Sequence, residues 1–243
     1  MTDQVLLSSE IFELLRIPST ATLTSVLSKH GLRNAGMVDV RPLKPGTHLV
    51  GQAFTLRYIP AREDLDYGGS VDNLTDPQRV AIEKLGPHDV LVIDARGDVR
   101  AGSMGAILAT RLHRRGAAGA VTDGAFRDYT EIAESGLAAF ARAAHPAANK
   151  TIHHPTDFQV PIACGGVAVY PGDVIVGDDD GVVVIPRHLA AEVTQAAVAQ
   201  EEREEFIFEK VRNGASIVGV YPPGPETLAE YEEWRKQRAA NRR

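Results

Sequence analysis

Arg127 and Asp128 are the residues whose types and position best suit catalysis. They lie in the segment DGAFRDYTE, residues 123–131, directly after the apolar run at 120–122. Ligands of open α/β sheets bind beyond the carboxyl ends of strands. A carboxylate such as Asp128 is a hard oxygen ligand suited to Mg²⁺ or Mn²⁺, and the guanidinium of Arg127 offers a fixed fork of donors to a carboxylate. Judged on spacing alone, an Arg/Asp pair that caps the next helix is the commoner arrangement.

A second candidate is the glycine-containing loop at residues 100–106, RAGSMGA, between an expected strand and an expected helix. Glycines there let backbone N–H groups approach an anion, and the helix dipole favours negative charge. The loop matches neither a P-loop nor a dinucleotide-binding fingerprint. A plain strand-to-helix turn is the alternative interpretation.

Other reactive residue types form no convincing site. Asp178, Asp179 and Asp180 lie in an expected hairpin turn, where a solvated turn is a better interpretation than a metal cluster. The histidines form no HExxH motif, and no GxSxG motif occurs. The sole cysteine, Cys164, lies in an apolar strand and is expected to be a buried, inert thiol. No lysine ends an apolar strand as a Schiff-base lysine would, so carbon–carbon chemistry would rely on a metal.

Hydrophobic periodicity predicts the elements that must position these residues. Helices are expected at 9–15, 19–31, 77–85, 102–115, 189–212 and 226–243, and strands at 50–58, 90–94, 120–123, 160–170, 174–176 and 182–185. A strand, a glycine-rich turn, a helix and a second strand between 90 and 123 make a βαβ unit, which favours a parallel pair. The polar segment 62–76 is expected to be a long functional loop.

Composition excludes several classes of protein. The 243 residues carry a formal net charge of −6, which argues against a nucleic-acid binder and provides no basic anchor for an anionic membrane. One cysteine allows no disulfide within the chain. The beginning of the sequence does not resemble a signal peptide. We therefore expect a soluble, cytoplasmic protein.

The segment from residue 89 to 131 resembles the RraA-like family, which includes class II 4-hydroxy-4-methyl-2-oxoglutarate aldolases and the regulator of ribonuclease activity A. The family hallmark is a glycine about twenty residues before Arg-Asp, followed by two residues and an acid. Gly105, Arg127, Asp128 and Glu131 match it. The opening STATLTSVLSKHG and the hairpin PGDVIVGDDDGVVVIP (171–186) are also similar to family motifs, so the resemblance extends over residues 18–215.

This resemblance implies an α/β class with a swivelling α/β/β domain, here with helical extensions at both ends. We expect one domain over residues 1–220 and a helical tail over 221–243. It also implies a homotrimer or homohexamer with active sites between subunits. Asp128 would be the protein ligand of Mg²⁺ or Mn²⁺, and Arg127 would bind the carboxylate and keto oxygen of a small 2-oxo acid. The backbone N–H groups of Gly105, Ala106, Ile107 and Leu108 would hold another part of that acid.

One departure from the family concerns proton transfer. The aldolases carry Asp or Glu directly after the glycine, where it orients a metal-bound water, whereas this chain has Ala106. The catalytic acid–base role would then fall to Glu131, to Asp123 or to the 62–76 loop. Retro-aldol cleavage needs a base for the C4 hydroxyl. Decarboxylation of oxaloacetate needs none, so it should tolerate Ala106 better.

Three functions follow from these observations. The first is a metal-dependent lyase that cleaves 4-hydroxy-2-oxo acids to pyruvate, decarboxylates oxaloacetate, or does both. The second is a regulator that binds a ribonuclease, in which the acidic run at 201–205 would imitate nucleic acid. The third is a sugar-acid enzyme that uses Arg62, Asp64 and Asp66 to recognise hydroxyl groups.

Overall fold

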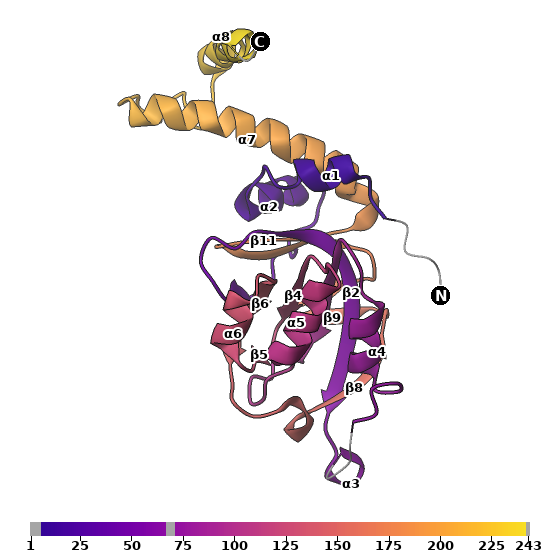
Figure 1. Ribbon diagram of the computed structural model, residues 1–243. Helices are drawn as coiled ribbons and strands as arrows, with labels where there is room; N and C mark the ends of the chain where they lie inside the picture. Colours follow the sequence, from indigo (N-terminus) through magenta and orange to yellow (C-terminus); the bar gives the residue numbers. More distant parts are fainter. Residues whose placement is uncertain (1–5, 67–70, 242–243) are drawn as a thin grey trace.

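A curved, mixed β-sheet forms the centre of the molecule (Figure 1). The structure is a computed structural model that describes residues 6–66 and 71–241. Along the sheet the strands are β1 (Arg41–Pro42), β6 (Ala138–Ala141), β4 (Gly119–Thr122), β3 (Asp89–Asp94), β2 (Leu49–Pro60), β11 (Val174–Asp178) and β12 (Gly181–Ile185). An eighth strand, β8 (His153–Phe158), also pairs with β2. The sheet curls until β1 contacts β11 and β12, which nearly closes it into a barrel.

Strand β2 organises this sheet because it has three partners. It runs parallel to β3 on one edge, while its other edge pairs antiparallel with β11 through its first half and with β8 through its second half. Its first eight residues, LVGQAFTL, are all buried. A strand covered on both faces in this way is typically a near-continuous apolar run.

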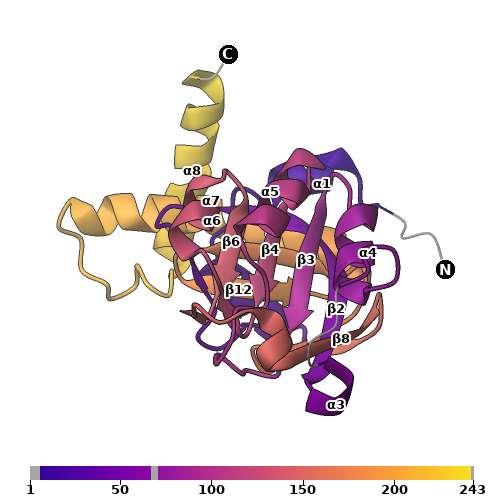
Figure 2. The same ribbon diagram turned by 60° about the horizontal axis from the view of Figure 1, so that its bottom comes forward.

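Three helices cover the outer face of the parallel strands: α4 (Pro77–Lys84), α5 (Ala106–Arg114) and α6 (Tyr129–Glu134) (Figure 2). Ile82, Leu112 and Ile132 from these helices pack on Leu91 and Ile93 of β3. The concave side holds a second apolar cluster, and the hairpin of β9 (Ile162–Cys164) and β10 (Val167–Val169) contributes to it. The helices are therefore fixed to the strands whose ends lead into the candidate site.

The terminal helices lie on the β11–β12 side. Helices α1 (Ser9–Leu14), α2 (Thr20–Lys29) and α7 (Ala190–Arg212) pack there in a third apolar cluster. The Ser19 hydroxyl accepts from the Thr22 N–H, which caps α2. Gly31 takes a positive φ just beyond its end. Helix α2 is also tied to the β11–β12 turn, because Thr20 donates to Asp178 from both N–H and hydroxyl.

The chain ends in an arm, made of the second half of α7 and helix α8 (Pro225–Asn241), that points away from the sheet (Figures 1 and 2). Phe206 of α7 packs against Tyr231 and Trp234 of α8. Short elements complete the fold: α3 (Glu63–Asp66), β5 (Ala125–Phe126), β7 (Ala143–Ala144), and 3₁₀ turns at Asn149–Thr151 and Arg187–Leu189.

The α/β class and the helical extensions at both ends are confirmed, as is the parallel β3–α5–β4 unit. The helix expected at 102–115 begins later, at Ala106, because the segment before it is held by β5: Gly102 forms a bridge with Ala125, and the Ser103 N–H donates to the Ala125 oxygen. The strand region 160–170 is a hairpin with Gly165 and Gly166 at its turn, both at positive φ. The 62–76 segment contains α3, and its residues 67–70 lie outside the described part of the chain.

Candidate active site

Asp128 lies at the junction of β5 and α6, but its carboxylate forms a hydrogen bond with the neighbouring helix α5. Its backbone is left-handed (φ 59°, ψ 47°), and its side chain makes no capping bond to α6. Instead, Oδ2 accepts the N–H of Ala106, the first residue of α5, at 3.1 Å. Asp128 thus occupies the N-cap position of α6, as the sequence alternative expected, but its side chain does not cap that helix. The carboxylate sits at the positive end of α5, as a bound anion would.

Arg127 and two glycines fit closely around this carboxylate. Arg127 Nε lies 3.3 Å from Asp128 Oδ1, and both side chains are partly exposed. A Cβ on Gly105 would lie 2.8 Å from Asp128 Oδ2, and one on Gly102 would lie 2.6 Å from the Arg127 nitrogen. Residues 102 and 105 must therefore be glycine for the loop and the Arg-Asp pair to approach this closely.

A buried polar network holds the loop that carries Gly105. The Ser103 carbonyl oxygen accepts from the Tyr58 hydroxyl at 3.0 Å and from Gln78 Nε2 at 2.7 Å, while Ser103 donates its N–H and hydroxyl to the Ala125 oxygen. Burial raises the pKa of Tyr58 well above its usual range, so the phenol stays a donor. Strand β2, helix α4 and strand β5 thus fix the backbone at the start of α5.

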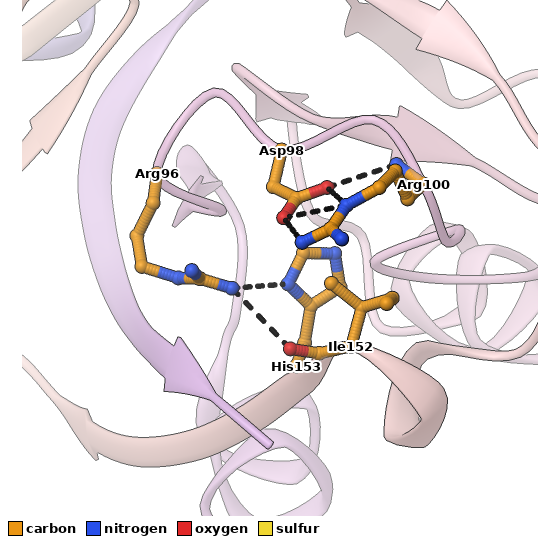
Figure 3. Close-up of polar contacts among 5 residues, drawn as sticks. All are labelled: Arg96, Asp98, Arg100, Ile152 and His153. Atoms are coloured by element: carbon orange, nitrogen blue, oxygen red, sulfur yellow. Dashed lines mark hydrogen bonds and ion pairs between the residues drawn. The ribbon is translucent and has the colours of Figure 1, made fainter.

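A second polar cluster steadies the chain before this loop (Figure 3). Arg96 donates to His153 Nδ1 at 3.2 Å and to the Ile152 oxygen at 3.3 Å, and Asp98 accepts a two-pronged contact from Arg100. The Arg100 contact holds the pKa of Asp98 well below its usual value. Burial is the largest influence on His153 and lowers its pKa. The cluster is structural: it joins the β3–α5 connection to β8.

A shallow pocket opens beside the Arg-Asp pair. Strands β5 and β7 run parallel with Phe126 opposite Ala144, so the next residues, Arg127 and His145, follow in register. The pocket has a volume of about 480 Å³ and is lined by Phe126, Arg127, Asp128, Tyr129, Ala144, His145 and Pro146. Sequence reasoning missed His145. Its flanking segments are alanine-rich and carry no motif, so the β5–β7 pairing is the signal that locates it.

The remaining predicted site residues are those that offer backbone N–H groups at the start of α5, and Glu131. The N–H groups of Gly105 and Ile107 meet no acceptor in the described part of the chain, and Leu108 donates to the Gly105 oxygen. These amides stand at the start of α5 beside Asp128. Glu131 is exposed on α6 and does not line the pocket. Whether Glu131 takes part in catalysis stays a prediction.

Asp123, the other proposed acid–base residue, is buried and does not line this pocket. Its carboxylate accepts the N–H groups of Ala95, Gly97 and Gly165. Burial is the largest cause of its raised pKa, and the nearby Asp94 adds to it. Asp123 therefore organises the turn after β3 and is poorly placed to serve as a base beside Arg127.

The weaker candidates make structural contacts in the fold. Cys164 is buried, and burial raises the pKa of its thiol well above the usual value. Asp178 and Asp179 bind α2 and the Gly46 N–H. Among residues 6–66 and 71–241, no three His, Cys, Asp or Glu side chains gather into a cluster that could hold a metal ion by themselves. No described helix is long and apolar enough to cross a membrane.

Fold and site together define a class: a curved α/β protein with an Arg-Asp pair set against the N-terminus of a βαβ helix. The chain belongs to the RraA-like family, whose model (Aldolase/RraA) matches residues 20–184. The expected membership and fold type are thereby confirmed.

Relatives in the family carry different names. A protein of Halalkalibacterium halodurans, provisionally named 4-hydroxy-4-methyl-2-oxoglutarate aldolase, is 36% identical over 182 residues, which cover 75% of this chain and 80% of that protein. Protein DlpA of Legionella pneumophila is 28% identical over 199 residues, 82% of this chain. The matched region spans only 31% of DlpA.

Solved structures share the fold over most of the chain. An uncharacterized protein of Pseudomonas syringae pv. tomato superposes with a TM-score of 0.77 and 27% identity, covering 89% of this chain and 99% of that one. Streptomyces coelicolor RraAS2, described as an unusual member of the RNase ES inhibitor RraA family, gives 0.75 and 33% identity over 83% and 97%. Family membership thus leaves both an aldolase and a regulator open.

Proposed function

We propose that the protein is a divalent-metal-dependent lyase that cleaves 4-hydroxy-2-oxo acids to pyruvate, decarboxylates oxaloacetate, or does both. The observation that carries this proposal is the Arg127–Asp128 pair at the start of α5, held over glycines at 102 and 105 that leave room for it. The name of the relative from H. halodurans supports an aldolase.

The residues present fit Mg²⁺ or Mn²⁺. Asp128 offers carboxylate oxygens at a pocket, and its bonded partners are a single backbone N–H and Arg127. Mg²⁺ keeps most of its waters and often binds through one or two carboxylates together with its substrate. Asp128 would be the protein ligand, and the ion would supply Lewis-acid polarisation of the 2-keto group.

The chain's own residues would bind and orient the oxo acid. Arg127 would hold the 1-carboxylate and keto oxygen, and its fixed positive charge would stabilise the negative charge that develops as the C3–C4 bond breaks. The N–H groups of Gly105 and Ile107, which have no acceptor among the described residues, would bind a second oxygen at the N-terminus of α5. Ala106 supplies no carboxylate, so decarboxylation, which needs no base, is the reaction that these residues support best.

Assembly belongs to this proposal. We expect a homotrimer or homohexamer with sites between subunits. The shallow, open pocket supports this expectation, as do the large apolar side chains exposed on the arm, Phe208, Ile217 and Val218. Light scattering coupled to size exclusion measures the mass directly.

A regulatory binding role is the second candidate, favoured by the similarity to RraAS2. The acidic run is a poor imitation of nucleic acid, however, because its members are largely paired. Glu202 contacts Arg235 at 3.2 Å, and Glu205 contacts Arg238. An inhibitor would slow ribonuclease cleavage equally well with Asp128 replaced, whereas a lyase would not need a ribonuclease partner.

The deciding experiment measures pyruvate release from oxaloacetate and from 4-hydroxy-2-oxoglutarate, with Mg²⁺, with Mn²⁺ and with EDTA. We expect metal-dependent release and a loss of at least about a hundredfold in Asp128→Asn, which keeps size and can keep the left-handed backbone. Activity that persists in EDTA, or no release from either acid, would overturn the proposal.

A further inference from the structure

His145 lines the same pocket as the Arg-Asp pair. The parallel register of β5 and β7 brings it beside Arg127, and its backbone N–H donates to the Phe126 oxygen at 3.0 Å. In-register residues of parallel strands direct their side chains to the same face. His145 and Arg127 therefore border the same pocket from neighbouring segments.

The hydrogen bond at Nδ1 determines what His145 can do. The N–H of Ala147 points to His145 Nδ1 at 3.1 Å. A backbone N–H can only donate, so Nδ1 accepts, and the neutral ring carries its proton on Nε2. A nitrogen that bears a proton cannot ligate a metal or act as a base. Nε2 is therefore a hydrogen-bond donor, and it meets no acceptor in the described part of the chain.

The other residues of the pocket leave one group of the substrate for such a donor to bind. Arg127 and the amides at the start of α5 serve the 1-carboxylate and keto end of the substrate. Phe126, Ala144 and Pro146 are apolar, and Tyr129 packs on the outer core with its pKa raised by burial. His145 thus adds a fixed donor beside the head-group site, and the acceptor still to be bound on a 2-oxo diacid is its second carboxylate.

We infer that His145 binds, through Nε2–H, the remote carboxylate of dicarboxylic 2-oxo acids and makes the site prefer them to monocarboxylic acids of equal length. This inference rests on the proposed function, because it assumes that Arg127 and Asp128 bind the oxo-acid end. It assigns to His145 a specificity role that the Arg-Asp motif does not contain.

Two unreactive acids test this role without turnover. 2-Oxoglutarate and 2-oxopentanoate have the same chain length and differ only in the remote carboxylate. Calorimetric titration in Mg²⁺ should give tighter binding of 2-oxoglutarate to the wild-type protein by about ten- to a hundredfold, the range of one hydrogen bond to a charged group. His145→Ala should abolish this preference and leave the affinity for 2-oxopentanoate nearly unchanged.

A matched pair of variants separates substrate binding from loop anchoring. The Oδ1 of His145→Asn can accept the Ala147 N–H in place of Nδ1, but the shorter side chain has no donor where Nε2 was. The amide nitrogen of His145→Gln lies near the place of Nε2 and keeps the donor. We expect His145→Asn to lose the preference and His145→Gln to keep part of it. The opposite ranking, or a preference in His145→Asn equal to that of the wild type, would overturn the inference.

Failure of the proposed function would give a different binding result from failure of the inference about His145. If neither acid binds the wild-type protein in Mg²⁺, the 2-oxo-acid site itself is wrong and the role of His145 falls with it. If both acids bind equally well, the oxo-acid site stands and the inference about His145 is wrong. A comparison of KM with kcat for 4-hydroxy-2-oxoglutarate, whose remote carboxylate stays intact in the reaction, gives an independent readout, because loss of a residue that binds the remote group should raise KM more than it lowers kcat.

Discussion

At the scale of single residues, the site depends on the absence of a side chain at Gly105. Gly105 lies so close to Asp128 that a methyl group on Gly105 would be 2.8 Å from Asp128 Oδ2. Gly105 itself has φ −119°, which other residues adopt readily. The glycine is therefore needed for the position of the carboxylate and not for the backbone.

Gly105→Ala should consequently damage activity much more than stability. The carboxylate must move by a few tenths of an ångström or more, and misplacement of a catalytic group can reduce rates by about tenfold to a hundredfold. The midpoint of urea unfolding should change little. Pyruvate release from oxaloacetate and urea unfolding measure the two effects.

Gly36→Ala is the control for this substitution, because a Cβ at Gly36 meets nothing within 4 Å. It should leave both quantities near wild type. Full activity in Gly105→Ala would mean that the position of the Asp128 carboxylate does not matter for the reaction.

At the scale of elements, the β3–α5 connection depends on a neutral histidine. His153 is buried and accepts from Arg96, and its folded-state pKa lies below the ordinary value of 6.5. In the pH range between the folded-state pKa and 6.5, the unfolded chain binds a proton that the folded chain does not. The free energy of unfolding therefore decreases as pH falls through that range and changes no further below it.

His153→Gln removes this titration. Between about pH 7.5 and about pH 5.5, wild-type protein should lose more unfolding free energy than the variant does, as measured by urea unfolding at each pH. His48→Gln is a useful comparison, because burial is also the largest cause of the lowered pKa of His48. The charge of Arg16 lowers that pKa further. An equal pH response in wild type and His153→Gln would refute the role of His153.

Elements with strong local patterns were predictable. Helix α4 has Asp76 as its N-cap and Pro77 at its first turn, and both signals are in the sequence. Strand β8 was missed because its sequence, HHPTDF, is polar and contains proline, and its pairing with β2 stabilises it. The start of α5 was placed too early because the non-helical conformation of residues 102–105 depends on contacts with β5.

The site residues likewise differ in whether a local sequence pattern or a tertiary contact determines their place. Arg127, Asp128 and Gly105 form a motif with fixed spacing, so the sequence was enough to find them, and their proximity follows from the βαβ unit. Asp123 was weighed as a base because sequence cannot reveal that three N–H groups already occupy its carboxylate. His145 reaches the pocket through a tertiary pairing of two short alanine-containing strands, which no local pattern encodes.

At the scale of the whole molecule, the arm is joined to the body mainly through α7. Trp234 is the single tryptophan of the chain. It stacks on Tyr231 and packs at a tilt against Phe206, and its Nε1 donates to Glu209 at 2.9 Å. These contacts are few compared with those of the sheet, and local units with little buried apolar area open at lower free energies than the core.

Tryptophan fluorescence should therefore report α8 undocking at lower urea than the loss of far-UV circular dichroism. Tyr231→Ala should move the fluorescence transition to still lower urea and leave the main transition in place. Such a result would support a boundary between a domain at 1–220 and a tail at 221–243. Coincident transitions in both proteins would mean that the arm and the body unfold as one unit.

The three-way pairing of β2 has a consequence for synthesis on the ribosome. Its neighbours β8 and β11 are translated long after β2. In the nascent chain, the apolar strand β2 therefore has one edge without a partner until β8 and β11 have been synthesised. Ribosome-bound chains that stop before residue 174 should remain sensitive to protease along β2, while chains that include β12 should become resistant. The order of translation thus makes the last hairpin of the sheet the step that protects its central strand.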